Sequence, residues 1–227
     1  MNATSAPPDT RAALIEAAIA VFGAVGFRNA TVRDICQRAG ANVAAVNYHF
    51  GDKESLYLEV LRQVQRLADA RHPLPPARGT ARAGQRLEGF VHSFLLRLLD
   101  PGPNAAGSKL MAREMVDPSG VFDTVMAEQI QPIADEVRGI VTELLGQGAS
   151  EEAVRMCGIS IVSQCLFYHQ CRDVVLALFP DFDLGGSGVE RLARHITQFA
   201  RAGVRQTAKG GKQPGRPPLK GTSGSAL

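Results

Sequence analysis

The chain has 227 residues, of which 45% are hydrophobic, so it is long enough to bury a sizeable core in one or two domains. Its two ends are basic and its middle is acidic: the net charge is +3 over residues 1–82, −8 over 83–190 and +8 over 191–227. The acidic middle is therefore excluded as a nucleic-acid surface, whereas either basic end qualifies.

Secretion and membrane insertion are not expected from the sequence. Residues 1–9 lack the basic start and apolar run of a signal peptide, and no window reaches the ~18–20 uninterrupted apolar residues of a membrane span. The four cysteines form no Cys-x-x-Cys pair, so we expect buried reduced thiols rather than disulfides or a metal site. These features predict a cytoplasmic protein without a membrane partner or a metal.

The first helix is expected to begin at Asp9 or Thr10, after a disordered arm over residues 1–9. From Leu14 onward its apolar residues recur at positions i, i+3, i+4, i+7, i+8 and i+11, which lie on one face of a helix. Gly26 is the expected end of this helix.

Two short helices follow, joined by a turn of roughly four residues that contains a glycine. Thr31 and Asp34 match a capping box at the start of the first, which is expected to end at Gly40. Asn42 is expected to cap the second, which runs to about His49. This spacing predicts a helix-turn-helix.

The stretch from Thr31 to Leu56, TVRDICQRAGANVAAVNYHFGDKESL, resembles the N-terminal DNA-binding domain of the TetR family. The resemblance covers about residues 10–60 and depends on many residue types at fixed spacing. The matching positions are Phe22, Gly26, Phe27, Thr31, Ile35, Ala39, Gly40, Phe50, Lys53, Glu54 and Leu56. It implies binding to double-stranded operator DNA. The chain departs from the family at Asn47, where an aromatic residue is frequent, which leaves its base preference open.

Nine residues are expected to contact DNA: Thr31, Arg33, Asn42, Ala44, Ala45, Asn47, Tyr48, His49 and Lys53. The small residues at the start of the second short helix let it enter a major groove, where an alanine touches a thymine methyl and Asn47 pairs with an adenine edge. The remaining polar groups suit phosphate, and Lys53 lies in the first turn of the next helix, where a cation and exposed N–H groups favour an anion. Tyr48 has an alternative role as a domain-packing residue.

Beyond residue 70 the pattern stays helical, so we expect an all-α protein. A proline-rich loop separates a DNA-binding domain at 10–70 from a helical bundle at 80–206, with a disordered basic tail at 207–227. The bundle's helices are expected at about 83–99, 107–116, 119–145, 150–178 and 187–205, with a kink at Pro132. The segment 150–178 is apolar nearly all round and is expected to be buried.

Two motifs in the larger domain, Arg113–Ser119 and Cys165–Cys171, resemble the C-terminal domain of the CerR branch of the family. The family resemblance implies a homodimer, formed mainly by the last two helices, and a small-molecule effector that the motifs do not identify. Polar groups on a buried helix need partners or a cavity, so the expected pocket residues are His92, Met111, Arg113, Met115, Gln164, Tyr168 and His169. The alternatives are an ion pair of Arg113 with Glu114 or Asp117, and a core or interface position for His169.

The leading hypothesis for function is a ligand-responsive repressor that binds a palindrome as a homodimer, with the helix that begins at Asp52 coupling the two domains. An activator has the same sequence features. An enzyme is not expected, because the sequence has no catalytic motif, no glycine-rich phosphate loop, no metal cluster and no sign of a cofactor. An architectural DNA-binding protein is the third hypothesis, since Pro214–Pro217 resembles the Gly-Arg-Pro core of an AT-hook; a solubilising tail is the alternative.

Overall fold

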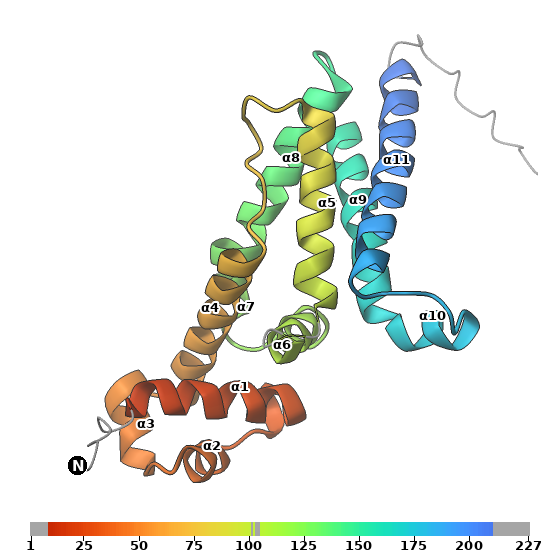
Figure 1. The fold of residues 1–227 in the computed structure, drawn as a ribbon. Coiled ribbons are helices and arrows are strands. Elements are labelled where there is room, and N and C mark those ends of the chain that lie inside the picture. The colour runs from red at the N-terminus through yellow and green to blue at the C-terminus, as the bar shows by residue number, and fades with distance from the viewer. Residues whose placement is uncertain (1–8, 101, 103–104, 211–227) are drawn as a thin grey trace, which may run out of the picture.

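The computed structural model describes residues 9–100, 102 and 105–210, and all the regular elements in these residues are helical. The N-terminal domain holds α1 (Thr10–Asn29), α2 (Val32–Ala39) and α3 (Val43–Phe50) at one end of the molecule. The fourth helix, α4 (Lys53–Arg71), starts in this domain and rises toward the remaining helices (Figure 1). The predicted all-α fold with an N-terminal helix-turn-helix is confirmed.

Side-chain caps set the ends of the helix-turn-helix, as the sequence predicts. The Thr31 hydroxyl oxygen accepts from the Asp34 N–H at 3.1 Å, and the Asp34 carboxylate accepts from the Thr31 N–H at 3.3 Å, which completes the capping box. Gly40 follows α2 at φ +65°, a left-handed conformation that favours glycine. The Asn42 side chain caps α3 by accepting from the Ala45 N–H at 3.0 Å. Local bonds therefore fix the turn between the two helices.

Helix α1 forms the centre of the N-terminal core, where Leu14, Ala18 and Phe22 are fully buried. Gly26 interrupts the helix at φ +80°, and one more turn carries it to Asn29, beyond the predicted end. By length and composition alone α1 could cross a membrane, since its mean hydropathy is 1.6. Its apolar face packs into the core instead, which accounts for this composition, so α1 is a core helix and not a membrane span.

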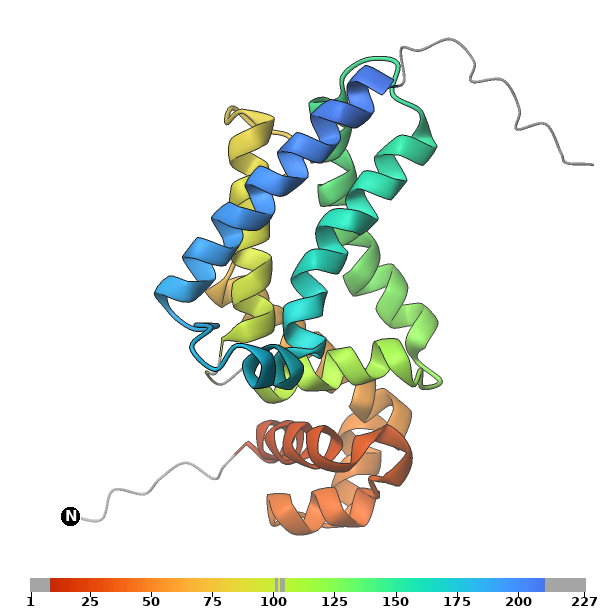
Figure 2. The ribbon, with the colours of Figure 1, turned by 90° about the vertical axis from the view of Figure 1, so that its right-hand side faces the viewer.

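The larger C-terminal domain is a bundle of α5 (Ala83–Leu99), α8 (Gln131–Leu145), α9 (Glu151–Gln170) and α11 (Ser187–Gly210). The shorter α6 (Ala105–Val116) lies across one end of this bundle and packs against α1, α4 and α5 (Figures 1 and 2). It therefore lies between the bundle and the helix-turn-helix.

The predicted helix 119–145 contains a change of helix type. A short α7 (Phe122–Val125) leads into a π-helical segment, η1 (Met126–Ile130), and α8 follows directly. Pro132 is the second residue of α8 and has no N–H to donate to the carbonyl of Glu128, four residues earlier. The helix distortion expected at Pro132 thus takes the form of a π-helical segment just before it.

The last helices differ from the prediction in their bounds. The predicted helix 150–178 is two helices, because Cys171 (φ −105°, ψ 24°) ends α9 before α10 (Arg172–Leu178) begins. Helix α11 continues to Gly210, so residues 207–210 are helical rather than part of a disordered tail. The rest of that tail with its Pro214–Pro217 motif, and residues 1–8 of the N-terminal arm, lie outside the described residues.

The predicted burial of α9 is also wrong for a single chain. Met156, Ile159 and Phe167 are 60%, 55% and 50% exposed, and Phe199 on the neighbouring α11 is 65% exposed. The three α9 residues fall at i, i+3 and i+11 and so share one face of the helix. In Figure 2, α9 and α11 form the side of the molecule that faces the viewer. The bundle therefore presents a side with exposed apolar residues on both helices, which we call the α9–α11 face.

Candidate functional site

The outer face of α3 carries most of the predicted DNA-contacting residues. Val46 is fully buried against the core, which turns Ala44, Asn47 and Tyr48 outward to exposed positions. Tyr48 is 86% exposed, and its ring lies 5.0 Å from that of His49. The alternative role of Tyr48 as a domain-packing residue is therefore wrong. A small residue, an amide and a phenol on one outward face offer apolar contact and hydrogen bonds to a groove.

Two of the predicted contact residues are already used to shape the helix ends. The Thr31 hydroxyl donates to the Asp34 carboxylate at 2.7 Å while accepting from the Asp34 N–H. The Asn42 amide oxygen accepts the cap bond at α3. Arg33 is exposed in the first turn of α2 and Ala45 is half-buried. Thr31 and Asn42 therefore act as helix caps, a role that the sequence predicted together with DNA contact.

Lys53 is tied to the start of α2 as well as lying in the first turn of α4. Its Nζ donates to the Ala30 carbonyl at 2.9 Å and lies 4.4 Å from the centre of the Phe27 ring. An ammonium has three N–H donors, so two remain beyond the bond to Ala30. The contacts hold the cation in one place beside the helix-turn-helix.

A buried carboxylate joins the two domains. Glu114 on α6 is 1% exposed and accepts from the Tyr57 hydroxyl at 2.9 Å, the Ser119 N–H at 3.0 Å and the Ser119 hydroxyl at 2.9 Å. Burial, and then the charge of Glu114, raise the pKa of Tyr57 far above its ordinary value. Tyr57 belongs to α4 and is itself 1% exposed, so this bond links the coupling helix to α6.

Close packing surrounds this link. A Cβ on Gly107 of α6 would lie 2.5 Å from a Val64 methyl of α4, so only glycine fits there without a shift. The Arg113 guanidinium covers the backbone of Gly26, and Asp117 pairs with Arg28 at 3.0 Å. The alternative of an ion pair between Arg113 and Glu114 or Asp117 is therefore wrong, because Glu114 accepts from Tyr57 and Ser119 and Asp117 pairs with Arg28.

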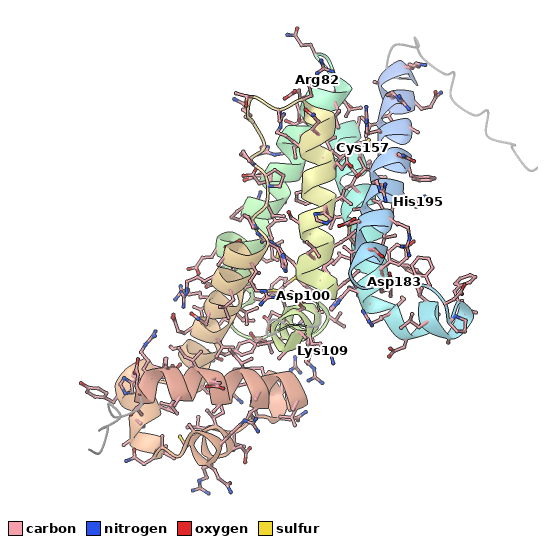
Figure 3. All side chains as sticks on the ribbon, viewed as in Figure 1. Arg82, Asp100, Lys109, Cys157, Asp183 and His195 are labelled. Carbon is pink, nitrogen blue, oxygen red and sulfur yellow. The ribbon has the colours of Figure 1, made fainter. Side chains whose placement is uncertain are left out.

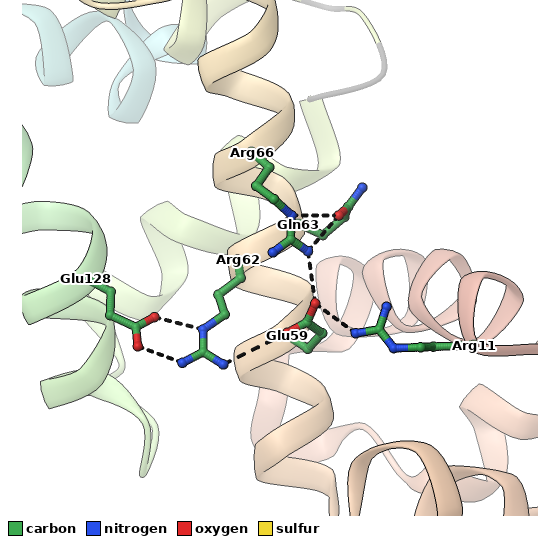
Figure 4. Close-up of polar contacts among 6 residues, drawn as sticks. All are labelled: Arg11, Glu59, Arg62, Gln63, Arg66 and Glu128. Atoms are coloured by element: carbon green, nitrogen blue, oxygen red, sulfur yellow. Dashed lines mark hydrogen bonds and ion pairs between the residues drawn. The ribbon is translucent and has the colours of Figure 1, made fainter.

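An ion-pair chain on α4 connects three helices, as Figure 4 shows. Glu59 of α4 accepts from Arg11 of α1 at 3.0 Å and from Arg66 at 2.9 Å. Burial raises the pKa of Glu59, but the hydrogen bonds from Arg66 and Arg11 outweigh it and hold the pKa below its usual value. Arg62 makes a bidentate pair with Glu128 of η1 at 2.6 and 2.8 Å, and this pair lowers the pKa of Glu128.

The predicted effector residues do not form one pocket. Arg113 and His169 line a cavity of about 780 Å³ between the ends of α5, α6 and α9, beside Asp100 and Lys109 (Figure 3). Met111 and Met115 pack against the N-terminal core instead. Gln164 donates to the Ser160 carbonyl of its own helix at 3.0 Å, and the Tyr168 ring stacks on Phe182 at 5.9 Å. His92 lies on α5, outside the lining of this cavity.

His169 is half-buried. Burial lowers the pKa of His169 below the ordinary histidine value, and the nearby backbone of Leu98 and Ser108 partly offsets this. The alternative of a satisfied core histidine therefore fits this residue better than a free ligand-binding group.

A second cavity of about 320 Å³ is lined by none of the residues expected to bind the effector. It is lined by residues of α4, α5, η1, α8 and the start of the loop after α4. Arg97, Gln129 and Glu136 line it, and each has a buried side-chain atom without a hydrogen-bond partner. The one sequence signal near it is Pro132, which lies three residues after Gln129.

Known families match both parts of the chain. Residues 14–60 match the model described as bacterial regulatory proteins, tetR family, and residues 83–204 match the C-terminal domain of the HTH-type transcriptional dual regulator CecR. The chain belongs to the TetR family of transcriptional regulators. The second match is to the branch that the motifs at Arg113–Ser119 and Cys165–Cys171 resemble. TetR-family proteins are DNA-binding regulators rather than enzymes, which confirms that prediction, and the Arg113–Ser119 motif of this branch forms the joint between the two domains.

Individual relatives agree with this assignment. CecR from Shigella flexneri is 26% identical over 177 residues, which cover 72% of this chain and 77% of that protein. FadR from Bacillus subtilis, solved in complex with stearoyl-CoA, superposes with a TM-score of 0.62 at 15% identity and covers 85% of this chain and 98% of its own. AibR, solved with isovaleryl coenzyme A and operator DNA, superposes with a TM-score of 0.61 at 14% identity over 84% of this chain and 97% of its own. The TetR-like fold is thus shared along nearly the whole length of these structures.

Proposed function

We propose that this TetR-family regulator is a cytoplasmic repressor that binds a palindromic operator as a homodimer and leaves it when a small effector binds the C-terminal domain. The exposed face of α3, with Ala44, Asn47 and Tyr48, is the observation that carries the DNA-binding part of the proposal. In this proposal the outward amide of Asn47 bonds an adenine edge in the major groove. Arg33, His49 and the two remaining Lys53 protons serve phosphates.

The α9–α11 face supports the homodimer. Exposed apolar side chains on two packed helices favour a partner with a matching surface, and a second copy supplies one by two-fold symmetry. Two reading heads in one dimer then meet successive major grooves, which lie ~34–36 Å apart on B-DNA. A palindromic operator follows from that symmetry.

Release by an effector is supported by the way α4 is held. Helix α4 is bonded to the helix-turn-helix through Lys53, which donates to the Ala30 carbonyl just before α2. The same helix is bonded to α6 through Tyr57 and to η1 through Arg62. A ligand that shifts α6 or η1 therefore shifts the reading head, and a small displacement is enough to break the groove spacing. AibR and FadR, with coenzyme A thioesters bound, illustrate that the fold accommodates ligands.

The base-reading role of Asn47 is tested on an operator selected from random DNA fragments by the purified protein. Asn47→Ala is expected to weaken binding and to relax preference at one position per half-site, by about 1–3 kcal/mol. Lys53→Ala should instead weaken binding to all sequences about equally and reduce the salt slope by about 1. Gln131→Ala, an exposed residue of α8, is the control and should bind like the parent. Equal affinity of the Asn47 variant for the selected operator would remove α3 as the reading helix.

A further inference from the structure

The second cavity gathers most of the unpartnered buried polar atoms of the described residues. Six such side-chain atoms occur in that part of the chain, and four of them belong to Arg97, Gln129 and Glu136, which all line this cavity. Gln129 is 3% exposed, and both its amide nitrogen and its amide oxygen lack a partner. Buried polar groups are almost always hydrogen-bonded, because an unpaired one destabilises the fold. Two of the four atoms, Gln129 Oε1 and Glu136 Oε2, are acceptors, and a ligand in this cavity could supply donors to them.

The π-helical segment explains how Gln129 reaches this position. Segment η1 follows a register different from the α-helices on either side, and Gln129 is the fourth of its five residues. Single π-helical turns recur at functional sites because they re-aim side chains that an α-helix would direct elsewhere. The Arg62–Glu128 pair also attaches this segment to α4. The π-helical turn and the bond to the coupling helix therefore lie in the same five residues.

The charges around the cavity favour a cation. Arg97 is 8% exposed and pairs with Asp69 at 2.9 Å, which neutralises both, and Glu128 is neutralised by Arg62. Glu136 then remains as the carboxylate with no ion pair among the described residues, and its buried Oε2 has no donor. Leu74, Pro132 and Ile133 supply apolar walls.

The size of the cavity limits the ligand further. A volume of about 320 Å³ lies at the lower end of the ~300–1,000 Å³ typical of small-molecule sites. A coenzyme A thioester does not fit such a space, and its phosphates would meet the carboxylate of Glu136. The cavity therefore favours a small ligand whose N–H groups reach the two unpartnered acceptors, Glu136 Oε2 and Gln129 Oε1.

We propose that this cavity, between α4, η1 and α8, is the effector site, and that the effector is a small organic cation that donates N–H groups to Glu136 and Gln129. The inference rests on the proposed function, whose effector it specifies. The unpartnered polar atoms are nearly inaccessible to water. A ligand can therefore bond them only if the side chains that line the cavity move. Those side chains include Gln65 and Asp69 of α4, and binding is thereby transmitted to the helix that carries the reading head.

Benzamidine and benzoate form a matched pair of probes, since they share a flat apolar ring and differ in charge. We expect benzamidine to bind the full-length dimer in isothermal titration calorimetry, and benzoate not to bind. Gln129→Leu and Glu136→Gln should each weaken benzamidine binding at least about tenfold. Saturating benzamidine should also lower operator affinity, by about fivefold or more, a usual size for coupling between two sites.

Two control variants and a melting-temperature measurement show whether any loss of benzamidine binding comes from the cavity itself. Gln131→Leu and Asp135→Asn change exposed or partly exposed residues of the same helix and should bind benzamidine like the parent. Gln129→Leu should raise Tm by about 2–4 °C, because it removes an unpaired buried amide rather than a bond. Equal binding of benzoate, unchanged benzamidine binding in both cavity variants, or operator affinity that ignores benzamidine would each overturn the proposal. Failure of the parent to bind any operator without benzamidine would instead overturn the proposed function.

Discussion

Glutamate at both Ile159 and Phe199 is expected to convert the dimer to a monomer and to reduce operator affinity by roughly 100-fold or more. Both side chains are more than half exposed on the α9–α11 face, so the substitutions are not expected to disturb the core of one chain. In a dimer of this variant, four carboxylates would be buried in an apolar interface without hydrogen-bond or ion-pair partners. A monomer binds only one half-site. It loses the gain from a linked second head, which typically raises overall affinity by ~10²–10⁴.

Light scattering and gel-shift titration of the same preparation check both effects together. Gln131→Glu is the control, because it adds a carboxylate at an exposed residue of α8, away from the α9–α11 face and from the joint between the domains. The control should remain dimeric and bind DNA like the parent. A double variant that stays dimeric would show that another surface joins the two copies, and a monomer with full operator affinity would contradict the two-headed mechanism.

The ends of the helix-turn-helix were predictable because the signals that set them are local. A cap needs one polar side chain and an N–H two or three residues away, so Thr31 with Asp34 and Asn42 with Ala45 can be read from adjacent letters. The outward face of α3 follows in the same way, from the position of buried Val46 relative to Asn47. The break of α9 at Cys171 has no comparable signal, since neither glycine nor proline marks it.

The effector residues were not predictable, because they converge only through tertiary packing. Arg97 comes from α5, Gln129 from a π-helical segment and Glu136 from α8, and each looks like a solvated polar residue in its own window. Gln164 and Tyr168 point to a pocket only if α9 is buried all round, whereas one of its faces is exposed in the single chain. Polar residues on an apolar helix indicate a cavity only when their neighbours in space are known.

Replacing Glu114 by alanine is expected to lower the free energy of unfolding by about 2–4 kcal/mol and to weaken the response of DNA binding to ligand. The change leaves the buried Tyr57 hydroxyl and the part-buried Ser119 N–H without their acceptor, and a buried donor left unpaired costs about 1–3 kcal/mol. It also removes the bond that joins α4 to α6. Denaturant unfolding measures the first effect, and operator affinity with and without benzamidine measures the second.

Two further variants distinguish loss of the Tyr57–Glu114 hydrogen bond from other effects of changing the joint between the domains. Asp117→Ala removes a carboxylate three residues along the chain whose pair with Arg28 is largely exposed, and an exposed pair contributes at most about 1 kcal/mol. Tyr57→Phe removes the donor instead of the acceptor, and combined with Glu114→Ala it should add little, because both changes break the same bond. Additive losses in the double variant would mean that Glu114 stabilises the joint mainly through Ser119, and the link between α4 and α6 would then depend on the close packing at Gly107.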